Sequence, residues 1–573
     1  MRKFNVLYAL AIVTIVTFTL SSCAENQYAF NQSTHIKNQS NITAQRSFSG
    51  GYLAGRFAQH QQDWDAAQFY MSTVLKHDKN NELLSQRTFL LTLGSGNIDK
   101  ALDIAKELSK TTTNELATIL LACNQINKEN FNKALEYINQ LPNEGFGQYT
   151  KPLLTAWAYV GLGKKEDALQ VLKENSSDND PTYNMHAGLI EEFTGNIGSA
   201  AKHYRAAMAG GLDLHTAIIV ANFFDKYKQE KIAENIYANL DKIYPFNPFS
   251  RSRNKNSLTN ITKASDGAAL AMFDLATLLY SKRAFDSAKI YNNVVQLLNR
   301  DYPLSKLMMG DIAALHNQYD KAVNIYSSVK RNSPVYWLSR NRVSEVYEIN
   351  GDLEKSISIL EEMSKETEIR TQVLASLGDT YRRHERFADA VNAYDAALSS
   401  VKKITNEHWK IIYARGMAKE KLNNWALAEK DLLQALEFQP ENPMILNFIA
   451  YSWASQGKNL KKAEKYAALA AKLDPNNGYV LDSYGWTLFL LGKYKDSIRT
   501  LEKAVEQMPG DSTILDHLGD AYWQANRKNE ARHQWNKAKD LSEDVSFKDL
   551  ISKKIKNGIV VPAQIERTQA KLY

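Results

Sequence analysis

Apolar, small and polar positions repeat near the C-terminus with a shift of 34 residues. Between residues 477 and 538, equivalent positions carry the same or a similar residue in two successive copies: Leu481 and Leu515, Asp482 and Asp516, Gly485 and Gly519, Leu488 and Tyr522, Ser497 and Ala531, Ala504 and Ala538. Two helical stretches separated by a short polar turn account for each copy. The segment therefore predicts a duplicated helical hairpin, and the same unit continues through most of the chain.

From about Gly50 to Leu541 the pattern resembles the tetratricopeptide repeat. In that family the eighth position is small because helices A and B touch there, the twentieth is Ala or Ser, and a proline near position 32 ends helix B. The residues that match the twentieth position are Ala67, Ala101, Ala134, Ala168, Ala200, Ala233, Ala288, Ala322, Ser356, Ala390, Ala428, Ala463, Ser497 and Ala531. The resemblance implies an all-α fold, a right-handed superhelical solenoid of about 14 hairpins, whose A helices line a concave groove.

The spacing between these residues is 32 to 35 except at two places. It is 38 between Ala390 and Ala428, and 55 between Ala233 and Ala288. The longer gap holds two prolines and a polar basic run, so it predicts a loop at residues 245–266. This loop divides an N-terminal array, residues 50–244, from a C-terminal array, residues 267–541. It is interpreted as an elbow between the arrays, or alternatively as a docking loop that uses Phe246 and Phe249.

The N-terminus has the pattern of a secretory signal. Two basic residues precede an apolar run, and small residues lead into Cys23, so residues 1–22 are predicted to be a signal peptide. The sequence from Leu20 to Cys23 resembles the bacterial lipobox, in which the cysteine is acylated after cleavage. By the same resemblance, Ala24 after the cysteine implies sorting to the outer membrane. Residues 23–49 would then be the acylated cysteine and a flexible polar tether, and the tail at residues 542–573 would cap the last repeat or bind an acidic surface.

Composition and motifs exclude most other classes of function. The formal charge of +7 is spread over 573 residues without a dense Lys/Arg block, which disfavours nucleic-acid binding. The sequence has no phosphate-binding glycine loop, no GxSxG and no HExxH. The two cysteines, Cys23 and Cys123, form no CxxC or Cys/His cluster. We therefore expect no enzyme activity, cofactor, metal or small-molecule substrate.

The candidate binding residues lie on the predicted A helices of the last three repeats. In the family, positions 2, 5, 9 and 12 point into the groove, and the residues at or beside these positions are Asn447, Tyr451, Tyr479, Asp482, Trp486, Phe489, Asp516, His517, Asp520 and Trp523. Aromatic rings between carboxylates suit an extended polypeptide. The alternatives are that Trp486 and Trp523 pack between repeats, and that the three aspartates form a solvated, water-facing surface.

Residues 446–494 and 515–535 look like a group of proteobacterial lipoproteins with tetratricopeptide repeats. That resemblance implies an outer-membrane adaptor, lipid-anchored on the periplasmic face, that presents cell-wall hydrolases to a carboxyl-terminal processing protease. The expected function is thus a scaffold whose partners are other proteins of the periplasm or envelope. The alternative is a component of an envelope export or assembly machine for polysaccharide, pilus or outer-membrane protein.

Overall fold

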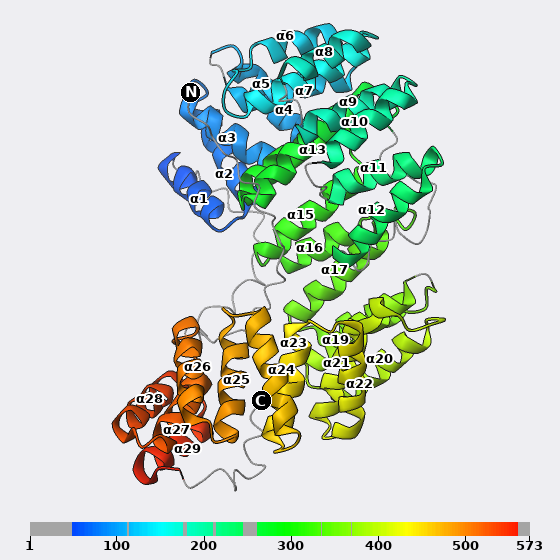
Figure 1. Ribbon diagram of the computed structural model, residues 1–573. Coiled ribbons are helices and arrows are strands. Elements are labelled where there is room, and N and C mark those ends of the chain that lie inside the picture. The colour runs from blue at the N-terminus through cyan, green and yellow to red at the C-terminus, as the bar shows by residue number, and fades with distance from the viewer. Residues whose placement is uncertain are drawn as a thin grey trace, which may run out of the picture. The chain divides into compact units, whose positions relative to one another are not determined.

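A computed structural model describes residues 48–111, 114–175, 180–209, 214–243, 261–333, 335–367 and 369–559. In these ranges the chain forms 29 α-helices and a short 3-10 helix, and no strand (Figure 1). Residues 1–22 and Cys23 lie outside the described ranges, as does most of the segment expected to be a loop at 245–266. Internal contacts divide the described residues into two compact units, and the boundary along the chain lies between Leu84 and Ser85.

The first unit is built on one helical hairpin, α1 (Phe48–His60) and α2 (Trp64–His77). Gly51 and Gly55 of α1 face the side chains of Val74 and Met71 of α2, where a larger residue would not fit. Small residues thus allow the two helices to lie close together. The Asp63 carboxylate accepts the Ala66 N–H at 2.9 Å and so satisfies a free donor at the start of α2.

The second unit begins with α3 (Glu82–Gly94), whose first residues still belong to the first unit, and continues with nine helices in sequence. These are α4 (Ile98–Leu108), α5 (Glu115–Asn127), α6 (Phe131–Asn139), α7 (Gly147–Gly161), α8 (Lys165–Asn175), α9 (Pro181–Phe193), α10 (Ile197–Met208), α11 (Leu214–Lys226) and α12 (Glu230–Ile243). Odd-numbered helices are the A helices and even-numbered helices are the B helices of successive hairpins.

The remaining helices follow the segment 244–260 and keep the same alternation. They are α13 (Ala264–Ser281), α14 (Phe285–Leu298), α15 (Pro303–Leu315), α16 (Tyr319–Ser327), α17 (Tyr336–Ile349), α18 (Leu353–Met363), α19 (Arg370–Arg383), α20 (Phe387–Ser399), α21 (Trp409–Lys421), α22 (Trp425–Phe438), α23 (Pro443–Ser455), α24 (Leu460–Leu473), α25 (Gly478–Leu490), α26 (Tyr494–Gln507), α27 (Ser512–Gln524), α28 (Lys528–Leu541) and α29 (Val545–Asn557). The 38-residue spacing before α21 holds the 3-10 helix Asn406–His408.

The repeated hairpins confirm the predicted fold class, because every residue assigned to the twentieth position lies buried in a B helix. The eighth position is small for the reason expected. A side chain at Gly378 would come within 2.5 Å of the Tyr394 ring, and one at Gly519 within 2.5 Å of the Trp535 ring. Where serine replaces alanine at the twentieth position, its hydroxyl finds a partner: Ser497 Oγ donates to the Gly485 carbonyl oxygen at 2.8 Å. Each repeat therefore meets the same steric demand with a different pair of residues.

A residue with positive φ connects helix A to helix B in every hairpin. Glycine takes this place six times, and polar or charged residues take it elsewhere, among them Asn317 at φ 57° and Glu385 at φ 58°. A left-handed residue at this position ends helix A and turns the chain into helix B. The turn geometry is thus common to all hairpins although its sequence is not.

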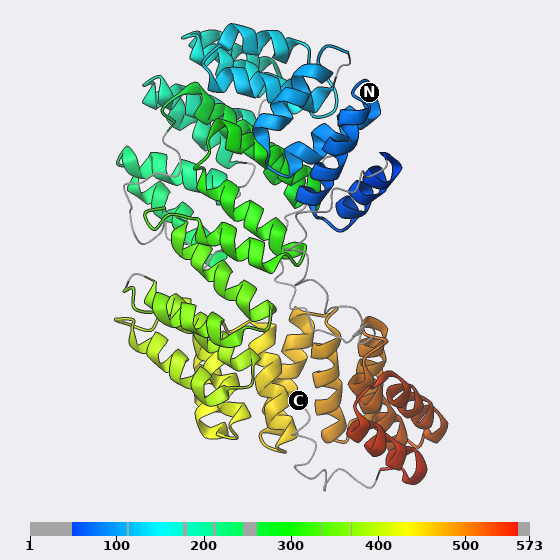
Figure 2. The same cartoon turned by 180° about the vertical axis from the view of Figure 1, so that it is seen from behind.

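The unusual 55-residue spacing corresponds to a change in packing. Helix α12 ends at Ile243, and α13 begins at Ala264, inside the segment predicted to be a loop. Instead of stacking mainly on the hairpin before it, α13 lies along α7, α5 and α9 (Figures 1 and 2). It is buried on most sides, as expected for a helix that is apolar all round.

Candidate functional site

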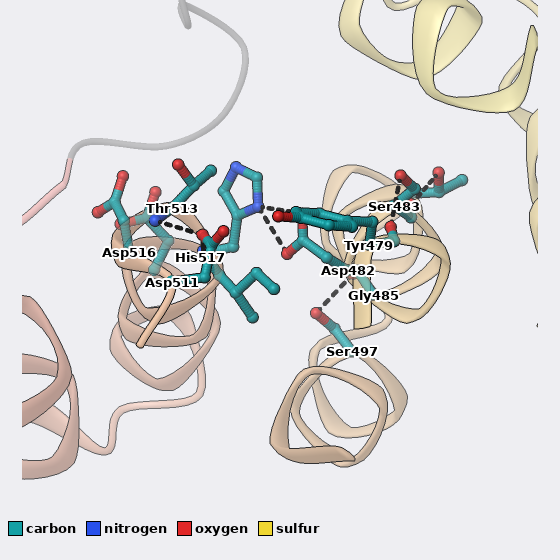
Figure 3. Close-up of polar contacts among 12 residues, drawn as sticks. Tyr479, Asp482, Ser483, Gly485, Ser497, Asp511, Thr513, Asp516 and His517 are labelled. Atoms are coloured by element: carbon teal, nitrogen blue, oxygen red, sulfur yellow. Dashed lines mark hydrogen bonds and ion pairs between the residues drawn. The ribbon is translucent and has the colours of Figure 1, made fainter. Parts of the chain in front are cut away.

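The sequence-predicted binding residues come from three neighbouring A helices, α23, α25 and α27. Helix α25 packs against both of the others. Each begins at an Asx residue that accepts backbone N–H groups of the first turn: Asn442, Asn477 and Asp511. Figure 3 shows this arrangement at the start of α27, where Asp511 binds the Thr513 N–H at 2.9 Å. The caps fix where these helices start and therefore which side chains face each other.

Between α25 and α27, His517 pairs with Asp482 (Figure 3). The His517 Nδ1 lies 2.9 Å from Asp482 Oδ1, and both side chains are buried. Burial lowers the pKa of His517, but the Asp482 carboxylate more than offsets this and the net pKa is raised. The Trp486 ring stacks on the imidazole with centroids 4.1 Å apart, and Phe489 also stacks on Trp486, with centroids 4.8 Å apart. This cluster joins two repeats from the inside.

Between α27 and α29, two carboxylates hold one lysine. The Lys554 Nζ lies 2.8 Å from both oxygens of Asp516 and 2.8 and 2.9 Å from those of Asp520. All three side chains are at most 8% exposed. Asp520 also accepts the Trp535 Nε1–H at 3.0 Å. Burial, with the neighbouring Asp516 charge, raises the pKa of Asp520 to about 6, and Lys554 limits the rise.

The same aromatic-to-acid hydrogen bond recurs in other repeats. Tyr326 donates to Asp311 at 2.5 Å and Tyr394 donates to Asp379 at 2.7 Å, with the same sequence separation as Trp535 and Asp520. In each case the donor lies on helix B and the acid at the ninth position of helix A of the same hairpin. An acid at this position is therefore partly held by its own repeat.

Asp482, Asp516 and Asp520 were predicted as groove contacts or, alternatively, as a water-facing surface, and these contacts bury them instead. Each is at most 7% exposed. The physical reason is that neighbouring helices lie close enough for His517 of α27 to pair with Asp482 and for Lys554 of α29 to pair with Asp516 and Asp520. Trp486, at 5% exposed, and Phe489 pack in the interior. For Trp486 this agrees with the alternative prediction that the tryptophan packs between repeats.

Trp523 is partly covered by neighbouring side chains of its own end of the chain. Its indole packs on Trp535 with ring centroids 5.4 Å apart, and the Lys528 Nζ lies 3.8 Å from its centroid. Gly558, just after α29, lies directly against the same indole. Helix α29 and Gly558 therefore cover the acids and the tryptophan of the last A helix.

Four residues on α23 and α25 are less buried than the residues of the two clusters described above. Tyr479 is 54% exposed, and Met444, which the sequence did not single out, is 60% exposed. Asn447 and Tyr451 are half-buried, and burial raises the pKa of Tyr451. The Asn447 Oδ1 is buried and accepts no hydrogen bond from the described part of the chain. We call Met444, Asn447, Tyr451 and Tyr479 the α23/α25 face.

The described ranges contain no group of three His, Cys, Asp or Glu side chains arranged to hold a metal ion. Cys123 is fully buried, and burial raises the pKa of its thiol. No helix in the part of the chain that the structure describes has the length and apolar character that crossing a bilayer requires.

The geometry defines a class of protein built from repeated helical hairpins. The family model of the tetratricopeptide repeat matches residues 413–478 and 485–542, which include Met444, Asn447 and Tyr451 of the α23/α25 face but not Tyr479. These residues are thus tetratricopeptide repeats, and the same hairpin recurs through the rest of the described chain.

A TPR repeat-containing protein of Pseudomonas aeruginosa is 35% identical over 114 residues. The matched stretch is 20% of this chain and 19% of that relative's own length.

Several solved structures share the helical character. The Cut9–Hcn1 structure of the APC/C matches 90% of this chain and 96% of its own at 13% identity, with a TM-score of 0.36. Yeast Tom70 matches 89% and 95% at 15% identity, with a TM-score of 0.32. A tetratricopeptide repeat protein of Parabacteroides merdae matches 45% and 98% at 16% identity, with a TM-score of 0.35. Scores at this level do not establish a shared arrangement of the repeats.

Proposed function

We propose that the chain is a non-enzymatic scaffold that binds extended segments of other proteins on the α23/α25 face. The observation that carries the proposal is the pair of exposed side chains, Met444 and Tyr479, near the starts of two A helices that pack together. Tetratricopeptide repeats in this part of the chain support it, because such repeats typically mediate contacts between proteins.

The chemistry of this face suits a polypeptide. Met444 and Tyr479 offer apolar area for side chains of the bound segment. Since Asp482 is already paired with His517 and Asp516 with Lys554, the face does not call for a strongly basic partner.

Site-specific photo-crosslinking in cells tests this proposal. A photoreactive phenylalanine analogue would replace Tyr479 or Met444, and in a matched control Leu427, which is 47% exposed on helix α22. We expect defined protein adducts from the first two positions and none of the same proteins from the control. Replacing the other of these two side chains by serine should reduce those adducts while leaving the fold intact. Identical adduct patterns at all three positions would contradict a specific binding face.

We further propose that the scaffold is anchored to the outer membrane through Cys23, which lies outside the described residues. The support is the sequence alone: the lipobox-like run from Leu20 to Cys23 after a signal-like segment. Anchor and tether would confine the α23/α25 face to the membrane surface and raise the effective concentration of bound proteins there. Palmitate labelling that persists in Cys23→Ala would overturn the anchor.

The most concrete form of this function is an adaptor that brings cell-wall hydrolases to a periplasmic processing protease. The support is the resemblance of residues 446–494 and 515–535 to such lipoproteins. Adducts at Tyr479 that contain a carboxyl-terminal processing protease or a hydrolase would agree with it. Adducts that contain components for polysaccharide, pilus or outer-membrane protein export would instead favour the assembly-machine alternative.

A further inference from the structure

The A helices α5, α7 and α9 carry a helix that comes from much later in the sequence. Besides its hairpin partner α14, helix α13 packs on α7 and also contacts α5 and α9 (Figure 2). Twelve of its side chains or glycine positions are buried, and they are mostly small or apolar. In the repeat architecture, the A-helix side is where a bound polypeptide would lie, so α13 takes the place of such a ligand.

The contact between α13 and α7 depends on a small residue. Gly267 of α13 lies directly against the indole of Trp157, and a Cβ at this position would overlap the ring. Trp157 itself is fully buried. One helical turn further along the same side of α13 is Ala271, which is also buried. The surface therefore selects a helix with small residues at this spacing.

A polar network gives the contact its specificity. Two turns beyond Gly267, Asp274 lies 2.9 Å from His186 Nε2 of α9 and 3.3 Å from His215 Nδ1 of α11. The other nitrogen of His186 accepts the Trp157 Nε1–H at 2.9 Å. His186 therefore presents Nε2–H to the carboxylate, and Trp157 fixes that orientation. Both imidazoles are buried, so a ligand without a carboxylate would leave the Nε2–H of His186 without its acceptor.

Helix α14 adds further contacts with helices from earlier in the chain. The Asn293 side-chain amide donates to the Leu93 carbonyl oxygen at 2.8 Å, at the end of α3. The Tyr291 ring packs edge-on against Phe146 beside α7, with centroids 5.4 Å apart. Residues 264–298 are thus held by direct contacts to α3, α5, α7 and α9.

We propose that the A-helix face of α5, α7 and α9 is a helix-binding site whose resident ligand is α13. The site recognises a helix with small residues at positions equivalent to Gly267 and Ala271 and a carboxylate at the position of Asp274. While α13 is seated, this half of the chain is closed to other proteins. The site is independent of the α23/α25 face, so either proposal can fail without the other.

The full-length soluble chain and a fluorescent peptide of residues 261–283 provide the test. In Gly267→Leu the larger side chain collides with Trp157 and unseats α13, whereas Gly198→Leu is a matched control because nothing lies near Gly198. We expect the peptide to bind Gly267→Leu at least about tenfold more tightly than the wild type or the control. A peptide that itself carries Asp274→Ala should bind Gly267→Leu more weakly. Equal binding to the wild type, or no binding to a folded Gly267→Leu, would overturn the proposal.

A second variant covers the case in which Gly267→Leu does not fold. Asp274→Asn preserves volume but removes the charge that faces His186 and His215. Hydrogen exchange should become at least several-fold faster in α13 and at the facing side of α7, with no change in α25. Exchange in α13 that matches the wild type would show that the network does not hold this helix as a ligand.

Discussion

Replacing Lys554 by methionine tests the buried charge cluster at the end of the array most directly. The ammonium has four oxygen contacts of 2.8 to 2.9 Å, and Lys554, Asp516 and Asp520 are nearly inaccessible to water. Methionine retains much of the volume but leaves two like-charged carboxylates facing each other without a cation. Removing one partner of a buried ion pair costs about 3–5 kcal/mol, and we expect a loss of this order at pH 7.

The pH dependence distinguishes this explanation from simple loss of packing. In the wild type the pKa of Asp520 is already about 6, above its ordinary 3.8, so the folded state binds this proton more tightly than the unfolded state. Stability from this group therefore rises as pH falls from about 6 toward 4. Lys554 lowers the pKa of Asp520, so without Lys554 this pKa should rise further and the gain in stability at low pH should be larger. The cost of Lys554→Met should thus shrink markedly by pH 5.

Denaturant unfolding between pH 5 and 8 provides the measurement, with hydrogen exchange to localise the effect. Because hairpins in such arrays are stabilised by their neighbours, the loss should concentrate in α27, α28 and α29. Lys553→Met on the same helix is the control, since Lys553 is exposed. A cost below about 1 kcal/mol at pH 7, or one that does not change with pH, would refute the reasoning, because a buried uncompensated pair must respond to protonation.

Three further predictions concern packing and acid stability. Ala322 is fully buried in α16, so Ala322→Leu should destabilise the fold by about 1–3 kcal/mol in denaturant unfolding, whereas Ala388→Leu at an exposed site should not. Ser497→Ala should cost less than about 1 kcal/mol, because alanine fills this position in most repeats; a larger loss in thermal unfolding would contradict that. Burial raises the pKa of Asp274, but the hydrogen bond with His186 and the nearby His215 outweigh it and lower the pKa to about 2. That group stabilises the fold by about 2 kcal/mol above pH 4, and the difference from Asp274→Asn should vanish in titrations from pH 4 to 2.

The hairpins were predictable from the sequence because their steric demands repeat. The twentieth-position residues, from Ala67 to Ala531, are all buried, since helix B approaches helix A at the same point in every repeat. The start of an A helix is likewise visible as an Asx residue before an apolar run, as at Asn477 and Asp511. These features depend on residues that are close together in the sequence, so they can be predicted without knowledge of long-range packing.

The candidate site was less predictable because the environment of a side chain depends on the neighbouring helix. Asp516 and Asp520 have the spacing of an exposed polar row, and contacts with Lys554 of the tail, and for Asp520 also with Trp535, make them interior. Helix periodicity showed the tail as a basic segment but not which of its lysines turns inward. Met444 carried no signal beyond an apolar residue near a helix start, and its exposure became evident only from the packing of α23 on α25.

The path of α13 was also beyond sequence patterns. The 55-residue spacing marked an interruption, but nothing local indicated that Asp274 would meet His186, 88 residues earlier. Such a contact depends on complementary shape and charge across distant segments, which a repeat period does not encode.

The packing of α13 on earlier helices also determines the order in which this half of the chain can fold. The Asn293 side chain reaches back 200 residues to the Leu93 carbonyl oxygen, a separation far greater than the length of one repeat. Contacts this distant in sequence slow folding, because a long stretch of chain must be closed before they form. The hairpins from α4 to α12 therefore emerge during synthesis with their inner side open, and their fold is completed only after α13 and α14 have been made.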